Sequence, residues 1–475
     1  MASVDGKMSR LQLTAMVVGG MVGAGIFSLP RTFAGATGPL GAVIAWLIAG
    51  TGMYMMARVF QFLAERKPAL DAGVFAYAKD GYGDYPGFLS AFGYWIGSCI
   101  GNVSYWVLIK STLGAFFPVF GEGNTMVAIG VASVGIWLFH FMILRGVQQA
   151  AAINTVVTIA KIIPIVVFIG IMAFAFKMDM FRFNFYGGGL EGGIGEQVRA
   201  TMLVTVFVFL GIEGASVYSR YARERRDVGF ATVSGFLLVT TLMVLVTLLP
   251  YAVIPREDIA GMRQPSMATV LEAVVGPWGA MFVSVGLLIS VLGAYLAWSL
   301  ICAEVMSAAA RTRAMPALFA RENSAKVPSA ALWATNLVTQ AIVITTYWSN
   351  DAFALMLNLT SSMSLIPFLL VASYAMQLTT RGDTYDTLRP GDRTRDVAIA
   401  AVATVYTGYL LYAGGLKFLV LSAILYAPGS LLYVWARREQ GRKVFERTAD
   451  LVLMALAVLG AALGIYWIAT GYIVL

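Results

Sequence analysis

Long apolar blocks recur along this chain of 475 residues and limit its fold more than any other feature. Each block has about 20 residues, which as a helix matches the thickness of the hydrocarbon core of a bilayer. Hydrophobic residues make up 59% of the chain and charged residues 12%, whereas soluble domains have about 25% charged residues. We therefore predict an all-α, polytopic membrane protein without a separate soluble domain.

The apolar blocks predict about 13 transmembrane helices. Their expected ranges are 11–34, 39–65, 86–118, 125–144, 148–177, 197–219, 226–253, 269–313, 328–348, 352–378, 395–413, 415–436 and 449–474. The eighth range is too long for one span, so we expect a short extracellular or re-entrant piece that ends near Gly276-Pro277. Residues 1–475 are predicted to form one transmembrane domain.

Lysine and arginine residues are distributed unevenly between the loops. Most of the 33 fall in alternate loops, near 66–79, 220–226, 311–326, 381–395 and 437–447. The positive-inside rule places these loops and the N-terminus in the cytoplasm. The net charge of +8 is then a consequence of topology, so no nucleic-acid partner is needed to explain it. The first ten residues and the long block after them do not fit a cleavable signal.

Two predicted spans carry breaks near mid-membrane. The first contains the run Gly19–Pro30, and the sixth contains Gly211 and Gly214 on either side of Glu213. Matched interruptions in two halves of a chain favour an inverted-repeat transporter. Unwound backbone exposes N–H groups for a carboxylate and carbonyls for an ammonium. Close packing of helices at the glycines is the alternative explanation.

Three motifs carry a family resemblance: Gly19–Pro30, Gly211–Ser216 and the loop Ala72–Gly83. Together they resemble the amino acid–polyamine–organocation superfamily, and within it the basic amino acid/polyamine antiporters, which include arginine/ornithine antiporters and lysine permeases. The resemblance implies a LeuT-like fold with broken first and sixth spans. Its two inverted repeats of five spans would be residues 11–177 and 197–378, with additional helices at 395–474.

The same resemblance implies a function in the plasma membrane of a prokaryote. The chain would exchange cationic amino acids, most simply arginine for ornithine, by alternating access, and a homodimer is compatible with the family. A proton-coupled uptake permease for lysine or another amino acid is the alternative within the class. An amino-acid sensor without transport on the same scaffold is the alternative from another class.

The resemblance also implies a substrate site. The carboxylate would bind the backbone of Gly23, Ala24 and Gly25, and the α-amino group would bind the carbonyls of Met21 and Leu210. The distal end would meet side chains of the third, sixth, eighth and tenth spans, namely Tyr94, Ser98, Cys99, Asn102, Phe207, Trp298, Ser361 and Ser362, with Thr360 beside them. Trp298 would offer a cation–π face. Packing remains the alternative for Trp298, and a helix–helix hydrogen bond remains the alternative for Asn102.

Four ionisable residues inside spans are candidates for gating or proton coupling, because burying charge in lipid is unfavourable. They are Lys110, Lys161, Glu213 and Glu304. The resemblance implies that Glu213 matches a glutamate that acts as a proton-sensitive gate. It also implies that Lys161 takes the place of a sodium ion, with its ammonium bonded to backbone of the first and eighth spans. The alternatives are a carboxylate that caps the broken backbone and a lysine that reaches the interface. Glu304 would either form a gate ion pair with Lys110 or Arg58, or lie at a solvated helix end.

Catalytic, metal and cofactor sites are not expected. The chain has one histidine, His140, and two cysteines, Cys99 and Cys302, which both lie in apolar blocks. This composition disfavours a membrane enzyme and a disulfide framework. A cation channel is also disfavoured, because it would need acidic rings or carbonyl filters repeated by symmetry.

Overall fold

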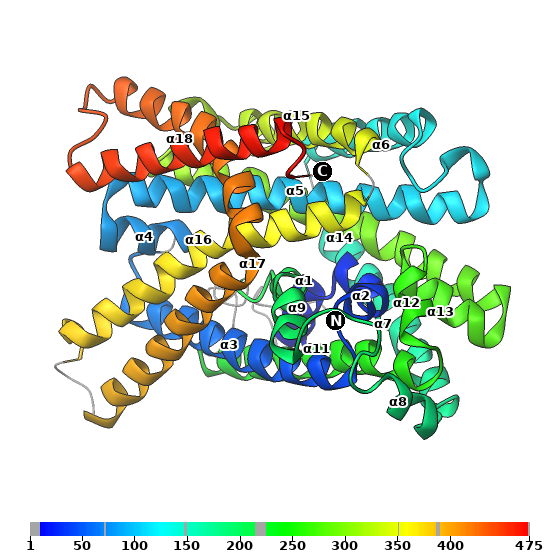
Figure 1. The fold of residues 1–475 in the computed structure, drawn as a ribbon. Coiled ribbons are helices and arrows are strands. Elements are labelled where there is room, and N and C mark those ends of the chain that lie inside the picture. Colours follow the sequence, from blue (N-terminus) through cyan, green and yellow to red (C-terminus); the bar gives the residue numbers. More distant parts are fainter. Residues whose placement is uncertain are drawn as a thin grey trace. The chain divides into compact units, whose positions relative to one another are not determined.

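A computed structural model of the chain describes residues 10–70, 73–146, 150–213, 225–349, 351–385 and 390–473. Throughout these ranges the secondary structure is helical, with no strand (Figure 1). A helix satisfies its backbone N–H and C=O groups internally, which a segment in lipid requires. The predicted all-α fold is thus confirmed for the described residues.

The chain divides into two compact units, each assembled from several stretches of sequence. Unit 1 consists of Met1–Ala57, Ser104–Ala132 and Gln148–Ala297. Unit 2 consists of Arg58–Val103, Ser133–Val147 and Trp298–Leu475. The boundaries between them fall inside the long helices α3 (Pro39–Arg66), α5 (Asp84–Phe116), α6 (Met126–Leu144) and α14 (Pro277–Arg311). The single domain expected from the sequence stays a prediction.

Unit 1 contains both broken spans. Besides parts of the long helices named above, it comprises α1 (Arg10–Met21), η1 (Ala24–Ser28), α2 (Leu29–Ala36), η2 (Pro118–Phe120), α7 (Ala150–Phe174), α8 (Met178–Asn184), α9 (Ile194–Phe209), α11 (Arg225–Leu248), η4 (Leu249–Ala252), α12 (Arg256–Gly261) and α13 (Ser266–Val275). Helix α1 packs on α11, and α2 contacts α9, α12 and α13. The first broken span therefore packs against several elements of the second half of the chain.

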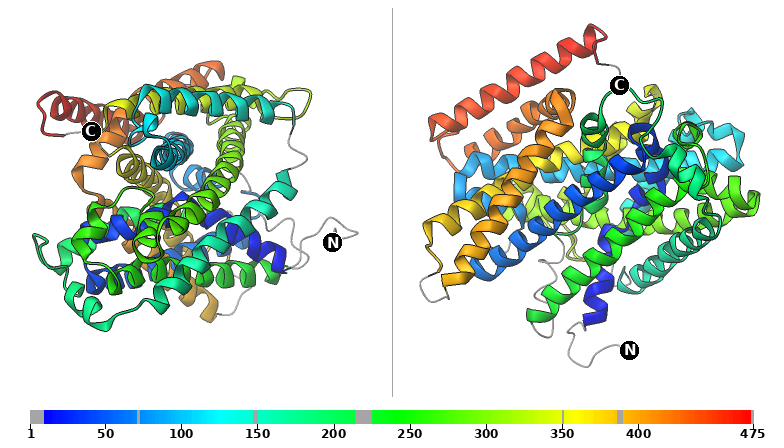
Figure 2. Two further views of the ribbon diagram at one scale, coloured as in Figure 1. Left: turned by 90° about the vertical axis from the view of Figure 1, so that its right-hand side faces the viewer. Right: turned by 60° about the horizontal axis from the view of Figure 1, so that its bottom comes forward.

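Unit 2 contains the C-terminal helices. Besides parts of the long helices named above, it comprises α4 (Val74–Tyr82), η5 (Ala317–Ala320), α15 (Ser329–Thr345), η6 (Thr346–Trp348), α16 (Ala352–Arg381), α17 (Pro390–Glu439) and α18 (Thr448–Ala469). Helix α16 contacts both α4 and α17, and α18 packs on α17. Figure 2 shows α18 in red beside the orange part of α17.

Seven helices in the described ranges are long and apolar enough to cross a membrane, or nine when two bent pairs are each taken as one span. One bent pair joins Leu13–Met21 to Ala24–Ala36 at 46°, and the other joins Ala160–Phe174 to Met178–Asn184 at 102°. This length criterion omits α9 and α15, which have 16 and 17 residues, and takes α17 as one span. The count of about 13 spans, taken from the apolar blocks, therefore stays a prediction.

Two glycines divide long helical stretches where the sequence predicts a division. Gly415 has φ 73° and ψ 169° inside the 50-residue α17, at the first residue of the predicted span 415–436. Gly276 has φ 86° and separates α13 from α14, as expected for a short piece that ends near Gly276-Pro277. Glycine adopts positive φ without steric penalty, so both breaks are local consequences of the sequence.

The end of α3 is fastened to the start of α17 within unit 2. Arg66 pairs with Asp396 at 2.9 Å, and its guanidinium carbon lies 4.1 Å from the centre of the Tyr385 ring. The Tyr385 hydroxyl donates to the same Asp396 carboxylate at 2.9 Å. Burial and this hydrogen bond raise the pKa of Tyr385 to about 12, so the hydroxyl remains a donor at neutral pH.

Candidate functional site

The first break lies within the glycine run in the middle of the first span. Helix α1 ends at Met21, and Gly23 is extended with φ −108° and ψ −155°. A 3-10 turn begins at Ala24 and continues into α2. Gly23 N donates to Met21 O at 2.9 Å, which bridges the break. The first N–H groups of a helix lack intrahelical partners, so this segment presents backbone donors beside the Met21 carbonyl.

The second break lies at the end of α9. Leu210 leaves the helix with φ −58° and ψ 136°, and Gly211 follows with φ 103°. The Glu213 side chain is 5% exposed, and its carboxylate accepts a hydrogen bond from Gly211 N at 3.1 Å. Glu213 therefore caps broken backbone, which is one of the two roles considered for it. The rest of the motif, Gly214–Ser216, lies outside the described residues.

The two breaks touch each other inside unit 1. A Cβ atom on Gly211 would lie 2.8 Å from Gly20 O. A Cβ atom on Gly25 would lie 2.7 Å from Val208 Cγ1 and 2.9 Å from Phe207 Cδ1. Real Cβ atoms do not approach other atoms this closely, so glycine is required for the contact. Close packing and backbone exposure are thus two properties of one arrangement.

Lys161 joins α7 to the first break. Its side chain is 1% exposed, and Nζ donates to Gly19 O at 2.5 Å and to Val22 O at 2.9 Å. These carbonyls belong to the last turn of α1 and to the break, where the regular helical acceptor pattern ends. The ammonium is buried, so Lys161 does not extend to the interface. Among the described residues, both hydrogen bonds from Nζ go to the first span and none goes to the eighth span.

The residues predicted for the distal end of a substrate lie in unit 2. On α5, Tyr94, Ser98, Cys99 and Asn102 are all buried. Ser98 Oγ donates to Tyr94 O at 2.7 Å. Trp298 begins the α14 segment of unit 2 and is half-buried.

Asn102 connects α5 to α14. Its Nδ2 lies 3.4 Å from Ser299 Oγ and 3.7 Å from Cys302 Sγ. Its Oδ1 is buried and accepts no hydrogen bond in the described part of the chain. The helix–helix hydrogen bond is therefore present, and one acceptor atom remains for a donor.

The polar run on α16 divides between two neighbours. Ser362 Oγ lies 3.0 Å from Ser422 Oγ of α17, and Ser361 Oγ donates to Leu357 O of its own helix at 3.0 Å. Thr360 instead faces α5, because its Cγ2 would lie 3.5 Å from a Cβ atom on Gly101. Helical periodicity distinguishes these faces, but the sequence does not show which face meets which neighbour.

The remaining charged candidates occupy different environments. The Glu304 side chain is 57% exposed and pairs with Arg311 at 3.3 Å, which matches a solvated helix end. Lys110 is 1% exposed and lies beside Gly123, on which a Cβ atom would be 3.1 Å from Lys110 Cβ. The role of Lys110 stays a prediction.

No group of three His, Cys, Asp or Glu residues that could hold a metal ion occurs among the described residues.

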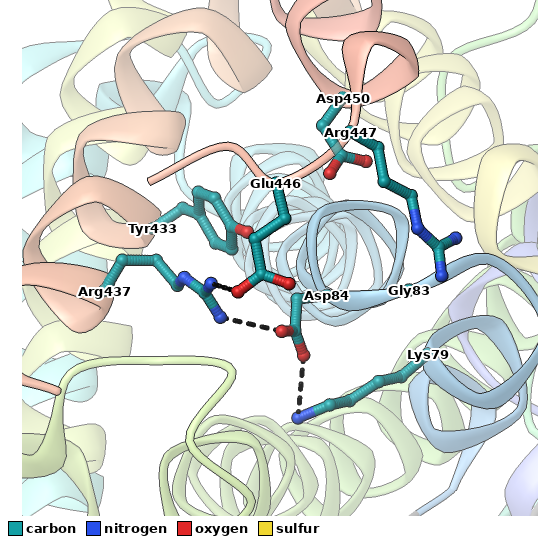
Figure 3. Close-up of a pocket in the computed structure, with 8 residues that line it drawn as sticks. All are labelled: Lys79, Gly83, Asp84, Tyr433, Arg437, Glu446, Arg447 and Asp450. Atoms are coloured by element: carbon teal, nitrogen blue, oxygen red, sulfur yellow. Dashed lines mark hydrogen bonds and ion pairs between the residues drawn. The ribbon is translucent and has the colours of Figure 1, made fainter. Parts of the chain in front are cut away.

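A pocket of about 140 Å³ lies at the start of α5, in unit 2. Figure 3 shows the residues that line it. Three cationic and three anionic side chains line it: Lys79, Arg437, Arg447, Asp84, Glu446 and Asp450. In the sequence these residues contribute only to the charge of predicted cytoplasmic loops. The pocket brings together residues that are far apart in the chain, so spacing gives no signal for it.

Long apolar helices and two broken helices in contact define a polytopic membrane protein of the transporter class. The sequence pattern of the amino acid permease family matches residues 8–417, and the chain belongs to this family. The resemblance to the amino acid–polyamine–organocation superfamily is thereby confirmed.

Full-length relatives share this family. The chain is 50% identical to the arginine/ornithine antiporter of Pseudomonas aeruginosa, over 99% of this chain and 98% of the relative. It is 40% identical to the L-lysine transport protein of Corynebacterium glutamicum, over 97% and 95% of the two chains. It is 37% identical to the arginine/agmatine antiporter of Chlamydia pneumoniae, over 98% of each chain.

The contact between the two breaks predicts an effect of Gly25 on stability. We expect Gly25→Val to lower the free energy of unfolding by about 1–3 kcal/mol, because the added methyl groups would overlap Val208 and Phe207. Gly35→Val is a matched control, since a Cβ atom on Gly35 has open space around it. Thermal unfolding in detergent would measure both, and equal melting temperatures would contradict the close contact.

Proposed function

We propose that this chain is a secondary active transporter that exchanges cationic amino acids, arginine for ornithine, by alternating access. The contact between the two broken spans carries the proposal, because it assembles exposed backbone from both halves of the chain at one place in unit 1. The full-length relative that is named an arginine/ornithine antiporter supports this substrate pair. Both amino acids have one net positive charge, so the exchange is electroneutral and needs no ion gradient.

The backbone of the breaks recognises the α-amino acid group. Donors between Gly23 and Gly25 bind the carboxylate, since a helix start favours an anion. The carbonyls of Met21 and Leu210 accept from the α-amino group. Met21 O already accepts one bond from Gly23 N, and a carbonyl has a second lone pair for the ligand. Phe207, which contacts the Gly25 segment, gives this region an aromatic wall.

The residues predicted for the distal cation lie in unit 2, and their chemistry by itself suits a cation. The unpaired Oδ1 of Asn102 suits a guanidinium or ammonium donor, and Thr360 Oγ1 is another buried oxygen without a hydrogen bond in the described residues. Trp298 supplies an aromatic face for the same cation. Tyr94, Ser98, Cys99, Ser361 and Ser362 complete the predicted set. Of these, Ser362 contributes least, because its hydroxyl already bonds α17.

The architecture that fits this function has a LeuT-like core of two inverted repeats of five spans. The broken first and sixth spans support it. Counting α17 as two spans at Gly415 supports additional C-terminal helices and a total of about 13 spans. The charge distribution supports an N-terminus in the cytoplasm of a prokaryotic cell. A homodimer is compatible with this arrangement.

Counterflow in proteoliposomes tests the proposed exchange. Vesicles loaded with ornithine should take up labelled arginine, and vesicles loaded with a neutral amino acid or with buffer should not. The flux should be independent of sodium and of membrane potential. Equal uptake into empty vesicles would reject obligatory exchange.

Proton-coupled uptake of lysine or another amino acid is the second candidate. The buried Lys161 favours it, because a lysine that can release a proton during the cycle could couple transport to the proton gradient. The relative named an L-lysine transport protein supports the substrate. Efflux from loaded vesicles separates the candidates, since an exchanger needs external substrate and a proton-coupled permease does not.

Replacing Trp298 tests the distal cation site. Trp298→Leu should weaken arginine binding by up to about thirtyfold, because a cation–π contact contributes about 0.5–2 kcal/mol. Arginine should lose more affinity than a neutral amino acid of similar size. Isothermal titration with both ligands measures the difference, and equal losses would indicate that the indole only packs.

Replacing Glu213 tests its role as a gate. Glu213→Gln keeps an oxygen that can accept from Gly211 N but removes the ionisable group. The variant should still bind substrate, and its exchange rate should change less with pH than the wild-type rate. Glu272→Gln, at an exposed position on α13, serves as the matched control. An unaltered pH profile of exchange would show that Glu213 is only a cap.

Replacing Lys161 tests the ammonium as a substitute for a bound sodium ion. Lys161→Ala leaves the carbonyls of Gly19 and Val22 without their charged donor, which destabilises by about 1–3 kcal/mol for a buried partner. We expect the exchange rate to fall at least tenfold while arginine affinity changes less, since the bond braces the broken span during the conformational step. Wild-type transport that requires sodium would contradict this role.

A further inference from the structure

The beginning of α5 is held by the C-terminal end of the chain at three consecutive places. Arg447 Nη1 donates to Tyr82 O at 2.9 Å, at the end of α4. Arg437 Nη1 donates to Asp84 Oδ2 at 2.7 Å, at the first residue of α5. The next residue, Tyr85, also contacts the C-terminal helices. These bonds connect positions more than 340 residues apart in sequence.

Arg437 is the centre of this attachment. Its side chain is only 2% exposed, and all three of its nitrogens are bonded. Besides Asp84, they donate to the Glu446 carboxylate (Figure 3). They also donate to Lys443 O at 2.9 Å. A buried guanidinium that is bonded through each of its three nitrogens fixes its partners in one geometry. Arg437 therefore ties the end of α17 and the linker 440–447 to the start of α5.

Tyr85 forms the apolar side of the same attachment. The side chain is fully buried. Its hydroxyl oxygen lies 3.0 Å from Ser430 Oγ of α17 and 3.3 Å from Met454 Sδ of α18. The ring centre is 5.0 Å from that of Tyr433 and 5.5 Å from that of Phe445. The last helix and its linker thus contact α5 through a packed aromatic cluster as well as through charges.

The joint between α4 and α5 lies at the place where these bonds meet. Gly83 separates α4 from α5 with φ 97° and ψ −172°, a conformation that favours glycine. A Cβ atom on Gly83 would lie 3.1 Å from Arg447 Nη1, so the guanidinium lies over the joint. The turn at Gly83 interrupts the helix, and the C-terminal side chains bond to residues on both sides of this turn. Residues 437–454 supply the contacts to Tyr82, Asp84 and Tyr85.

We propose that Arg437 and Arg447 are positioning residues for substrate recognition, and that residues 437–454 form a brace that sets the orientation of α5. The consequence for binding rests on the proposed function, because α5 carries Tyr94, Ser98 and Asn102 further along the same helix. A helix behaves as a rigid rod over such a distance, so a rotation at Asp84 moves the Asn102 acceptor. The brace thereby fixes the direction in which that acceptor meets the distal cation.

Two measurements on purified full-length protein test the brace. Hydrogen–deuterium exchange of the α5 amides needs no ligand, and arginine titration reports the dissociation constant. Arg437→Gln should speed exchange in the first turns of α5 and raise the arginine dissociation constant, each by about fivefold. Arg437→Lys should recover part of the affinity, since it keeps the charge and one donor for Asp84.

Arg442→Gln is the matched control. Arg442 is an exposed arginine of the same linker, and the bond it makes to Arg437 uses its backbone nitrogen. The control should show wild-type exchange and affinity. Asp84→Ala removes the other partner and leaves Arg437 bonded to Glu446 and Lys443 O. It should reproduce the effects of Arg437→Gln and replaces that variant if Arg437→Gln does not fold.

The outcomes separate the brace from the proposed substrate. Wild-type amide exchange in folded Arg437→Gln and Asp84→Ala would overturn the brace. Faster amide exchange with unchanged arginine affinity would overturn the positioning role. Failure of the wild-type protein to bind arginine would reject the proposed substrate, and the amide-exchange rates alone would then support or overturn the brace.

Discussion

A bilayer offers no water to an unpaired backbone group, and the rest of this structure depends on that constraint. Regular helices satisfy it internally, but the first and sixth spans each lack some of the backbone hydrogen bonds of a continuous helix. The unit 1 structure compensates with side chains. Lys161 donates to carbonyls of the first break, and Glu213 accepts from an N–H group of the second. Each break thus has a buried charge of the sign that its exposed backbone needs.

Glycine connects this compensation to function. Gly25 and Gly211 allow the two breaks to approach to a distance that no side chain would permit. A larger residue would separate the exposed donors of one break from the carbonyls of the other. The same residues therefore provide close helix packing and a polar surface of bare backbone. These are the two properties that a site for the shared part of all α-amino acids requires.

The sequence predicts features that depend on local chemistry. Glycine runs locate the breaks and the divisions at Gly276 and Gly415, because positive φ and loss of helix are properties of a few adjacent residues. The bond from Lys161 to the first span also follows, since a lysine in the middle of a span needs acceptors and a broken helix has them. Motifs, not spacing alone, identify the family.

Features that depend on distant contacts are harder to predict. Ser362 and Thr360 are two residues apart on α16, yet one bonds α17 and the other faces α5. Glu304 lies in an apolar block but reaches solvent and Arg311. The charges around Asp84 look like ordinary cytoplasmic loop charges until the chain is folded. In each case the deciding partner is far away in sequence, and single-residue patterns contain no information about it.

The pair formed by Asp84 and Arg437 has a consequence for biogenesis. The two residues are separated by 353 positions, so the ribosome makes the carboxylate long before it makes the guanidinium. During that interval α5 enters the membrane without the contacts that orient it. Its final orientation is fixed only after residues 437–454 have been made, so the third span adopts its working geometry late in synthesis.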